Sequence, residues 1–333
     1  MPDDPHTAAR RLFRDHVVWD DHAGFGPDPS VDLGKLRIWK EAGVDYLSVD
    51  VGYDVMDWRD TIKSLAAFRR WILATDGYRL VTSVAEVREA KKAGELAVTF
   101  DLEGMNCLDG SLDMVEMYHH LGVRQMLFAY NKNNLAGGGC HDGNEGLTPF
   151  GRAVVGEMNR LGMVVDLSHC SHRTTMEAME LSTAPCIFSH SNPRALWDHE
   201  RNIRDDQAKA CAATGGVVGI VGIGIFLGDN DIRTTTLADH VDHLVDLIGP
   251  AHVGIGLDYA FEAEEEGDGL AEVTAANTDY WPRHQYDYPS VDCAHPRQII
   301  ELTEELLRRQ YSEADVIGIL GGNFMRVAEA VWK

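Results

Sequence analysis

The chain has 333 residues, of which 44% are hydrophobic, and its formal net charge is −23 at pH 7. This length is typical of one (β/α)8 barrel with insertions, and the apolar fraction is sufficient for a substantial core. The strong negative charge argues against nucleic acid or an anionic membrane as a binding partner.

The N-terminal residues contain no apolar segment of signal-peptide length, and the chain has no run of about 18 consecutive apolar residues. Its six cysteines are scattered, without a CxxC pair or the spacing of a zinc finger. We therefore expect a cytoplasmic protein whose cysteines are free thiols.

Short apolar, β-rich segments alternate with helical segments along the chain, which predicts the strands of a parallel sheet. We predict strands at residues 16–24, 45–52, 96–103, 123–130, 163–169, 185–191, 216–225 and 252–258. This alternation indicates the α/β class and a (β/α)8 TIM barrel, whose active site forms at the C-terminal face of the strands. Because no linker divides the chain, we expect a single domain over residues 1–333.

Amphipathic segments between these strands predict helices at residues 60–75, 83–94, 149–162, 173–182 and 236–249. Ser83 and Glu86 have the spacing of a capping box, and Gly94 and Gly162 stand at helix exits. The tail from about residue 295 to 333 predicts two helices that close the domain.

Two long polar stretches follow predicted strands, at residues 131–151 and 260–290. Loops in these positions lie at the catalytic mouth of a barrel. The second stretch contains several aromatic residues, including Trp281 and Tyr286, and we expect it to form a lid or a subunit contact.

Five predicted strands end in residue types that bind metal ions. They are His22, Glu103, His169, His190 and Asp258. Because the carboxyl ends of barrel strands converge on one face, we expect these side chains to meet at a metal site. This layout is typical of a hydrolase in which a metal ion activates water.

His169 and His190 end neighbouring predicted strands, which lie about 4.8 Å apart in a sheet. Their imidazoles can therefore share one zinc ion at about 2.0–2.1 Å each. Glu103 has two carboxylate oxygens and could bridge two ions about 3.5 Å apart. The alternatives are buried histidines hydrogen-bonded to the backbone, and an ion pair between Glu103 and a loop arginine.

Asp258 could accept a proton from the attacking water and return it to a leaving amine. Its alternative role is a helix cap or a turn residue. His22 would supply a donor from the first strand, but Gly24 two residues later supplies none. Asp20 has the same strand parity as His22, and Asp21 is adjacent, so each is a candidate for a second donor.

Several motifs occur in an order and spacing that resemble the membrane (renal) dipeptidase family, zinc peptidases of the amidohydrolase superfamily. The matching stretches are DLEG (101–104), LGVRQMLFAYNKNN (121–134), GLTPFGRAVVGEMNRLGMVVDLSH (146–169), SHSNPRAL (189–196), RNIRDD (201–206), GIGLD (254–258) and GGNFMRV (321–327). The resemblance implies that Glu103 bridges two metals and that His169 and His190 hold the second zinc. It also implies that His22 belongs to the first zinc and that Asp258 is the catalytic acid and base.

The resemblance also assigns two contacts to the substrate. Arg201 falls where the family binds the terminal carboxylate, a task that suits a guanidinium group. The alternative for Arg201 is a salt bridge with Asp205 or Asp206. Tyr130 stands where the mammalian enzymes carry a substrate-contacting histidine, and a tyrosine hydroxyl can still donate a hydrogen bond to an oxyanion.

A second departure from the family pattern is Gly24. The first strand of the family usually contains His-x-Asp, and Gly24 stands where that aspartate would be. The first metal would then have fewer protein ligands, so one or two ions per chain are expected. Zinc is the expected metal, although such donors also accept Mn, Co or Fe.

These features predict a metal-dependent dipeptidase that hydrolyses short peptides, including L-Xaa-D-Xaa dipeptides, through a metal-activated water. Its partner would be a small dipeptide-like molecule, and family likeness suggests a homodimer. One alternative is an amidohydrolase of another amide or C–N bond with a single-metal site, because of Gly24. Another is a non-catalytic binding protein that kept the fold.

Overall fold

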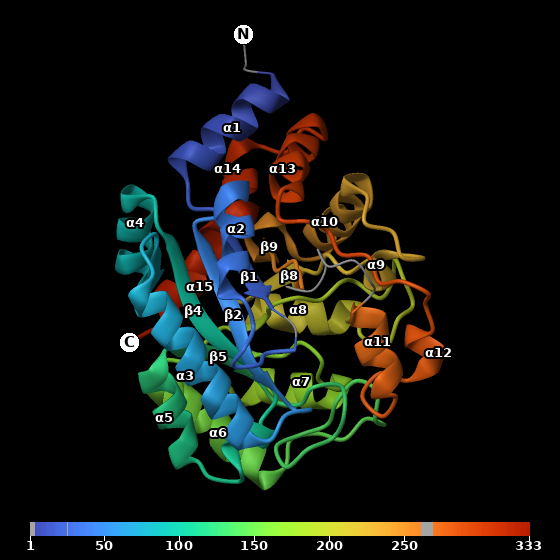
Figure 1. The fold of residues 1–333 in the computed structure, drawn as a ribbon. Helices are drawn as coiled ribbons and strands as arrows, with labels where there is room; N and C mark the ends of the chain where they lie inside the picture. The colour runs from blue at the N-terminus through green and yellow to red at the C-terminus, as the bar shows by residue number, and fades with distance from the viewer. Residues whose placement is uncertain (1–3, 25, 261–268) are drawn as a thin grey trace.

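The computed structural model describes residues 4–24, 26–260 and 269–333 (Figure 1). Its centre is a parallel sheet in the order β1-β2-β4-β5-β6-β7-β8-β9, with β3 beside β4. These strands are β1 (Trp19–Ala23), β2 (Tyr46–Tyr53), β3 (Tyr78–Leu80), β4 (Leu96–Glu103), β5 (Val123–Leu127), β6 (Val164–Asp166), β7 (Cys186–Phe188), β8 (Val217–Ile220) and β9 (Val253–Ile255). A bridge between Ala23 and Tyr259 joins the first strand to the end of the last, and the predicted (β/α)8 barrel is confirmed.

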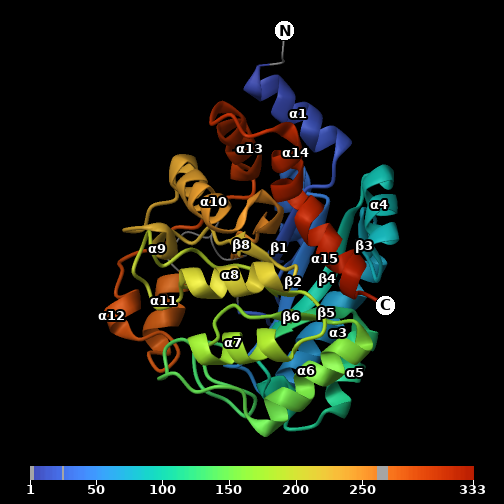
Figure 2. The ribbon, with the colours of Figure 1, turned by 180° about the vertical axis from the view of Figure 1, so that it is seen from behind.

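Helices surround this barrel on its outer side (Figures 1 and 2). They are α1 (Pro5–Asp15), α2 (Arg37–Ala42), α3 (Trp58–Ala74), α4 (Val84–Ala93), α5 (Asp113–Leu121), α6 (Pro149–Leu161), α7 (His172–Leu181), α8 (Asp205–Ala213), α9 (Gly224–Leu227), α10 (Thr234–Ile248), α11 (Gly269–Ala276), α12 (Arg283–Tyr286), α13 (Gln298–Arg308), α14 (Glu313–Ile317) and α15 (Asn323–Val331). Ser83 and Glu86 form the predicted capping box at the start of α4. The five predicted helices match α3, α4, α6, α7 and α10.

Three predicted strand ends and the predicted number of C-terminal helices are wrong. The strands that were expected to end at His169, His190 and Asp258 end two or three residues earlier, so these side chains lie in the loops that follow β6, β7 and β9. The C-terminal region contains three helices, α13, α14 and α15, instead of two, because a π-helical turn at Gly318–Gly322 separates the last two.

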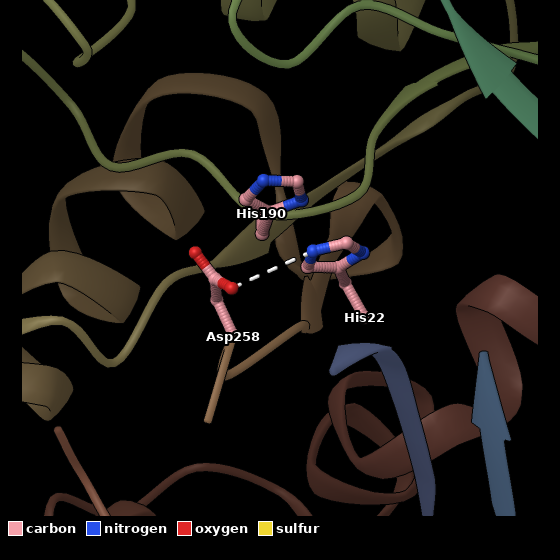
Figure 3. A group of neighbouring side chains, drawn as sticks. All are labelled: His22, His190 and Asp258. Atoms are coloured by element: carbon pink, nitrogen blue, oxygen red, sulfur yellow. Dashed lines mark ion pairs between the residues drawn. The ribbon is translucent and has the colours of Figure 1, made fainter. Parts of the chain in front are cut away.

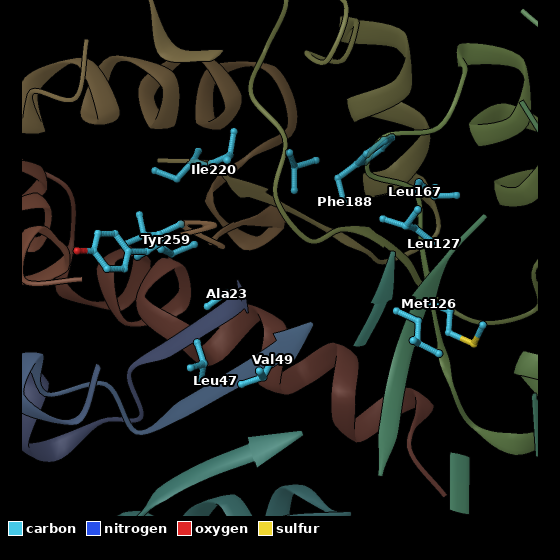
Figure 4. Packing of buried hydrophobic residues seen from close by; sticks show 14 of the residues in the cluster. Ala23, Leu47, Val49, Met126, Leu127, Leu167, Phe188, Ile220 and Tyr259 are labelled. Atoms are coloured by element: carbon cyan, nitrogen blue, oxygen red, sulfur yellow. The ribbon is translucent and has the colours of Figure 1, made fainter. Parts of the chain in front are cut away.

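Alternate residues of the strands face two different environments. Buried apolar side chains such as Leu47 and Val49 belong to the hydrophobic core (Figure 4). Their neighbours on β2 make polar contacts with β4: the Tyr46 hydroxyl lies 2.5 Å from the Thr99 hydroxyl, and Ser48 donates to Asp101. The two-residue period of a strand therefore gives this barrel an unusually polar lining beneath its mouth.

The N-terminal end of the barrel is closed by a second apolar cluster. Trp19 stacks on Tyr46 with ring centroids 3.4 Å apart, and α15 packs beneath them. Gly254 permits this approach, since a Cβ there would lie 2.3 Å from Cε2 of Phe324. The opposite, C-terminal end carries the predicted site residues.

Two segments lie over this C-terminal end. Residues 131–148 form an irregular loop, as predicted. Of the second predicted loop, residues 261–268 lie outside the described residues. Residues 269–290 of this predicted loop, together with Val291, are here called the covering segment (residues 269–291). The segment is not wholly irregular, because it contains α11 and α12, which lie beside α9 in both views (Figures 1 and 2). Among the described residues, no helix combines the length and apolar character needed to cross a bilayer.

Candidate metal centre

The structure brings all five predicted donor residues together at the mouth of the barrel. Potential ligand atoms of Glu103, His169 and His190 lie within 4.8 Å of one another, and so do those of His22, His190 and Asp258 (Figure 3). Each of the five side chains is buried. His190 belongs to both groups, so the two groups form one continuous centre.

The first group has the dimensions of a zinc site. Glu103 Oε1 lies 3.2 Å from His169 Nε2 and 3.3 Å from His190 Nε2, and the two nitrogens are 3.0 Å apart. A tetrahedral zinc ion with bonds of about 2.0–2.1 Å places its ligand atoms roughly 3.3 Å from each other. These three atoms therefore fit one ion with little movement.

The second group shares His190 with the first and adds His22 and Asp258. His22 Nε2 is 3.6 Å from Glu103 Oε1 and 3.5 Å from Asp258 Oδ1. The His22 ring stacks on His190 with centroids 3.9 Å apart (Figure 3). Glu103 Oε1 thus lies within 3.6 Å of an imidazole nitrogen of each of the three histidines.

Hydrogen bonds orient the imidazoles that follow β6 and β7. His169 Nδ1 donates to Asn131 Oδ1 at 2.7 Å. His190 Nδ1 lies 2.6 Å from Ser189 Oγ, and that hydroxyl donates its own proton to Asp166. Because each Nδ1 then carries the proton, each Nε2 presents a lone pair to the centre.

His22 is oriented by a carboxylate. Asp101 Oδ1 lies 3.2 Å from His22 Nδ1, and Asp101 accepts a hydrogen bond from Ser48 through its other oxygen. A carboxylate at Nδ1 again favours a lone pair on Nε2 toward the centre when a metal is bound.

The charges and the unpartnered atoms of the centre fit a cation. Glu103 Oε1 and His22 Nε2 are buried and have no hydrogen-bond partner among the described residues. Burial opposes protonation of His22, but the charges of Asp101 and Glu103 outweigh it and hold its pKa well above the ordinary value. Burial, helped by the charge of Arg201, lowers the pKa of His169 well below its ordinary value. Surplus negative charge beside neutral imidazole nitrogens fits a divalent metal ion.

Two of these residues have unusual backbone conformations. His169 has φ of 64° and Asp258 has φ of 57°, in the left-handed region that L-residues with side chains seldom adopt. Asn131, the partner of His169, has φ of 60°. These conformations turn the side chains into the mouth directly after β6 and β9, and such strain is concentrated at functional sites.

Gly24 contributes no donor, and neither Asp20 nor Asp21 replaces it among the described residues. A register shift in β1 between Asp20 and Ala23 breaks the alternation on which the parity of Asp20 was based. Asp20 instead accepts hydrogen bonds from Trp39 Nε1 at 2.9 Å and from the backbone N–H of Leu257 at 2.8 Å. Gly24 itself has φ of 104°, which would strain an aspartate at this position.

Tyr130 lies against the centre as predicted for a substrate contact. Its ring stacks on His169 with centroids 4.2 Å apart, and its backbone N–H donates to Asp54 Oδ2 at 3.0 Å. Burial, together with the charge of Glu103, raises its pKa well above the ordinary value, so the hydroxyl keeps its proton. It is therefore available as a hydrogen-bond donor.

Arg201 is almost fully buried beside the centre. It donates from Nη1 to Ser191 Oγ at 3.0 Å and from Nη2 to the carbonyl of His190 at 2.8 Å, while Nε has no partner among the described residues. The alternative salt bridge is wrong, because Asp205 and Asp206 pair with His243 and His172 instead.

Two cavities border the centre and share His169 as a lining residue. One also has Tyr130 and Asp258 among its lining residues. The other is lined largely by polar side chains, including Arg201. The centre is therefore bordered by an opening on two sides.

Sequence reasoning missed several residues of this centre. Asp50, near the end of β2, is buried and lies in register with Asp101, and its Oδ2 has no partner in the part of the chain that the structure describes. The apolar run before Asp50 is the same signal that identified Glu103, and Asp101 shares the strand parity of Glu103. No comparable signal marks Asn131, because only the folded chain brings it to His169.

The fold and the centre together define a (β/α)8 barrel with a cluster of metal-binding residues at its C-terminal face. The family model described as membrane dipeptidase (peptidase family M19) matches residues 29–278. The chain belongs to this family, as the resemblance indicated.

Individual proteins agree with this assignment. An uncharacterized dipeptidase of Schizosaccharomyces pombe is 32% identical over 302 residues, which cover 87% of this chain and 65% of that protein. Dipeptidase 3 of Macaca fascicularis is 31% identical over 296 residues, which cover 86% of this chain and 55% of that protein. The chain thus spans less than two thirds of the length of these relatives. A crystal structure of an amidohydrolase from Pseudomonas aeruginosa has a TM-score of 0.88 and 26% identity, covering 97% of this chain and 99% of that one.

Proposed function

We propose that this chain is a metal-dependent dipeptidase. The observation that carries the proposal is the group of Glu103, His169 and His190, whose ligand atoms lie 3.0–3.3 Å apart. The relatives named dipeptidases support the same activity for this chain. A bound zinc ion would lower the pKa of a water and polarise the scissile carbonyl.

The protein groups around this centre have distinct tasks in the proposed reaction. Asp258, beside His22 and at the cavity wall, takes the proton of the attacking water and delivers it to the leaving amine. The hydroxyl of Tyr130 donates a hydrogen bond to the carbonyl oxygen as negative charge develops there. Arg201 supplies positive charge beside His190, and its Nε remains available for the terminal carboxylate of the substrate.

The metal count decides between this function and its nearest rival. Gly24 leaves the His22 side of the centre with fewer donors, which favours an amidohydrolase of another amide or C–N bond with a single ion. We expect His22 to hold a second ion that Glu103 shares with the first, with Asp258 beside it as the acid and base. Elemental analysis of the purified protein should then find close to two metals per chain, whereas a value near one supports the rival.

Activity is tested with a panel of L-Xaa-L-Xaa and L-Xaa-D-Xaa dipeptides, because family likeness suggests tolerance of a D-residue at the C-terminal position. We expect turnover by the metal-loaded protein and its loss in Glu103→Gln. Glu95→Gln removes a carboxylate that pairs with Arg79 far from the centre and serves as the control. Full metal loading without cleavage of any dipeptide would overturn the assignment.

A further inference from the structure

The walls of the cavity over the candidate metal centre are largely apolar. Its floor contains the polar groups of Tyr130, His169 and Asp258. Its walls are formed by Ile223, Ile225, Phe226, Thr274, Trp281, Tyr286 and Val291. The described walls thus present no charged side chain to a molecule bound above the floor.

The walls are held in place by polar contacts outside the cavity. Four of the wall residues belong to the covering segment. Asn131 Nδ2 donates to the carbonyl of Tyr280 at 3.1 Å, and His199 Nε2 lies 3.2 Å from the carbonyl of Gln285. His141 Nε2 lies 3.0 Å from the hydroxyl of Tyr286. The apolar surface is therefore a built wall with a defined position over the centre.

The neighbouring cavity has the opposite character. Its lining residues include Arg194, Arg201, Arg204 and Glu200, and it shares His169 with the apolar cavity. A dipeptide has one carboxylate, at its C-terminal end, and that charge fits beside the arginines. The residue on the amino side of the scissile bond would then point into the apolar cavity.

Resting on the function proposed above, we propose that the apolar cavity selects dipeptides whose N-terminal residue has an uncharged, apolar side chain. Burial of apolar surface favours such side chains. A charged side chain would lose its hydration without gaining a partner from the walls. Among the described wall residues there is no lysine or arginine that could pair with a negatively charged substrate side chain.

The first test compares two dipeptide series on the metal-loaded protein. With D-Ala kept as the second residue, we expect kcat/KM to be about 100-fold higher for L-Leu or L-Phe than for L-Glu or L-Lys as the first residue. With L-Leu kept as the first residue, variation of the second residue should change kcat/KM much less. Equal values for L-Leu, L-Glu and L-Lys in the first series would overturn the proposal.

The second test uses two neighbouring residues of α11. Thr274 lines the cavity and is buried, whereas Ala275 is exposed. Thr274→Lys should lower kcat/KM for L-Leu-D-Ala at least about 10-fold. It should also reduce the ratio of kcat/KM for L-Leu-D-Ala to kcat/KM for L-Glu-D-Ala. Ala275→Lys adds the same charge to the same helix and should leave both values within about twofold. An unchanged preference in a folded, metal-loaded Thr274→Lys protein would contradict the proposal.

A binding measurement separates this proposal from the dipeptidase assignment. Isothermal titration of the wild-type protein with L-leucine hydroxamate and L-glutamate hydroxamate needs no turnover. We expect the leucine compound to bind at least about 10-fold more tightly. If no dipeptide is cleaved but this preference remains, the pocket stands and the dipeptidase assignment fails. Equal affinities would overturn the pocket even in an active enzyme.

Discussion

At the scale of single residues, the centre depends on which nitrogen of each histidine carries a proton. Asn131, Ser189 and Asp101 each lie at the Nδ1 of one histidine, which leaves the Nε2 atoms free to bind a metal. Such partners typically change metal affinity about 10–100-fold when they are removed. The contribution of these neighbours is therefore measurable separately from that of the ligands.

Two substitutions test Asn131, because Asn131→Leu removes the acceptor for His169 Nδ1–H whereas Asn131→Asp keeps an oxygen there, and both remove the Nδ2 donor to the Tyr280 carbonyl. We expect Asn131→Leu to bind zinc about 10–100-fold more weakly than the wild type, in competition with a chromophoric chelator. Asn131→Asp should stay close to the wild-type affinity. Wild-type affinity in the leucine variant would show that Asn131 does not orient His169.

At the scale of elements, the covering segment is tied to the barrel by side chains from other loops. His141 is buried and lies between two partners, with Nδ1 2.9 Å from Glu200 Oε2 and Nε2 3.0 Å from the hydroxyl of Tyr286. It therefore joins the loop after β5, the loop after β7 and α12. Removing this ring should loosen the covering segment and leave the barrel intact.

We expect His141→Leu to raise amide hydrogen exchange in residues 269–291 about tenfold, since a lost buried hydrogen bond of roughly 1.4 kcal/mol changes a local opening equilibrium by that factor. Mass spectrometry of peptic fragments measures this change against the strands of the barrel. His243→Leu removes another imidazole–carboxylate contact, with Asp205, and should leave this segment protected. Equal protection of the segment in His141→Leu would contradict the proposed tie.

At the scale of the whole molecule, buried neutral histidine makes stability depend on pH. Burial, and then the charge of His141, lowers the pKa of His199 to about 3. Its Nδ1 accepts the backbone N–H of Arg201 at 3.1 Å and its Nε2 lies 3.2 Å from the carbonyl of Gln285, which together require the neutral ring. An unfolded histidine has a pKa of about 6.5, so the unfolded chain binds one more proton between these values.

His199 should therefore stabilise the fold fully above about pH 6.5, and this contribution should be lost as the pH falls toward 3. We expect the free energy of unfolding to change by about 1.4 kcal/mol per pH unit through this histidine. Urea unfolding at several pH values gives the free energy of unfolding as a function of pH. Between about pH 3 and 6.5 this slope should be smaller by that amount in His199→Gln than in the wild type. The exposed His120 provides the control, since His120→Gln should keep the wild-type slope. An identical slope in His199→Gln would refute this account.

The apolar segments and the polar residues at their ends were sufficient to predict the barrel and its five candidate donor residues. An apolar run can be buried only between other layers, and a histidine or carboxylate at its end is costly to bury without a partner. Asp50 and Asp101 gave the same kind of signal and were overlooked beside Glu103. Asp20 was expected to point to the same side of the strand as His22. This expectation was wrong because side chains alternate strictly only in a regular strand, and β1 contains a register shift.

Only the tertiary structure decided how the donors are oriented and what covers them. Asn131 meets His169, and His141 meets both Glu200 and Tyr286, across long stretches of chain that have no local pattern in common. Local periodicity reports which face of an element is buried, but not which distant loop contacts it. The pairing of loops depends on the closed barrel, which places the carboxyl ends of all its strands around one mouth.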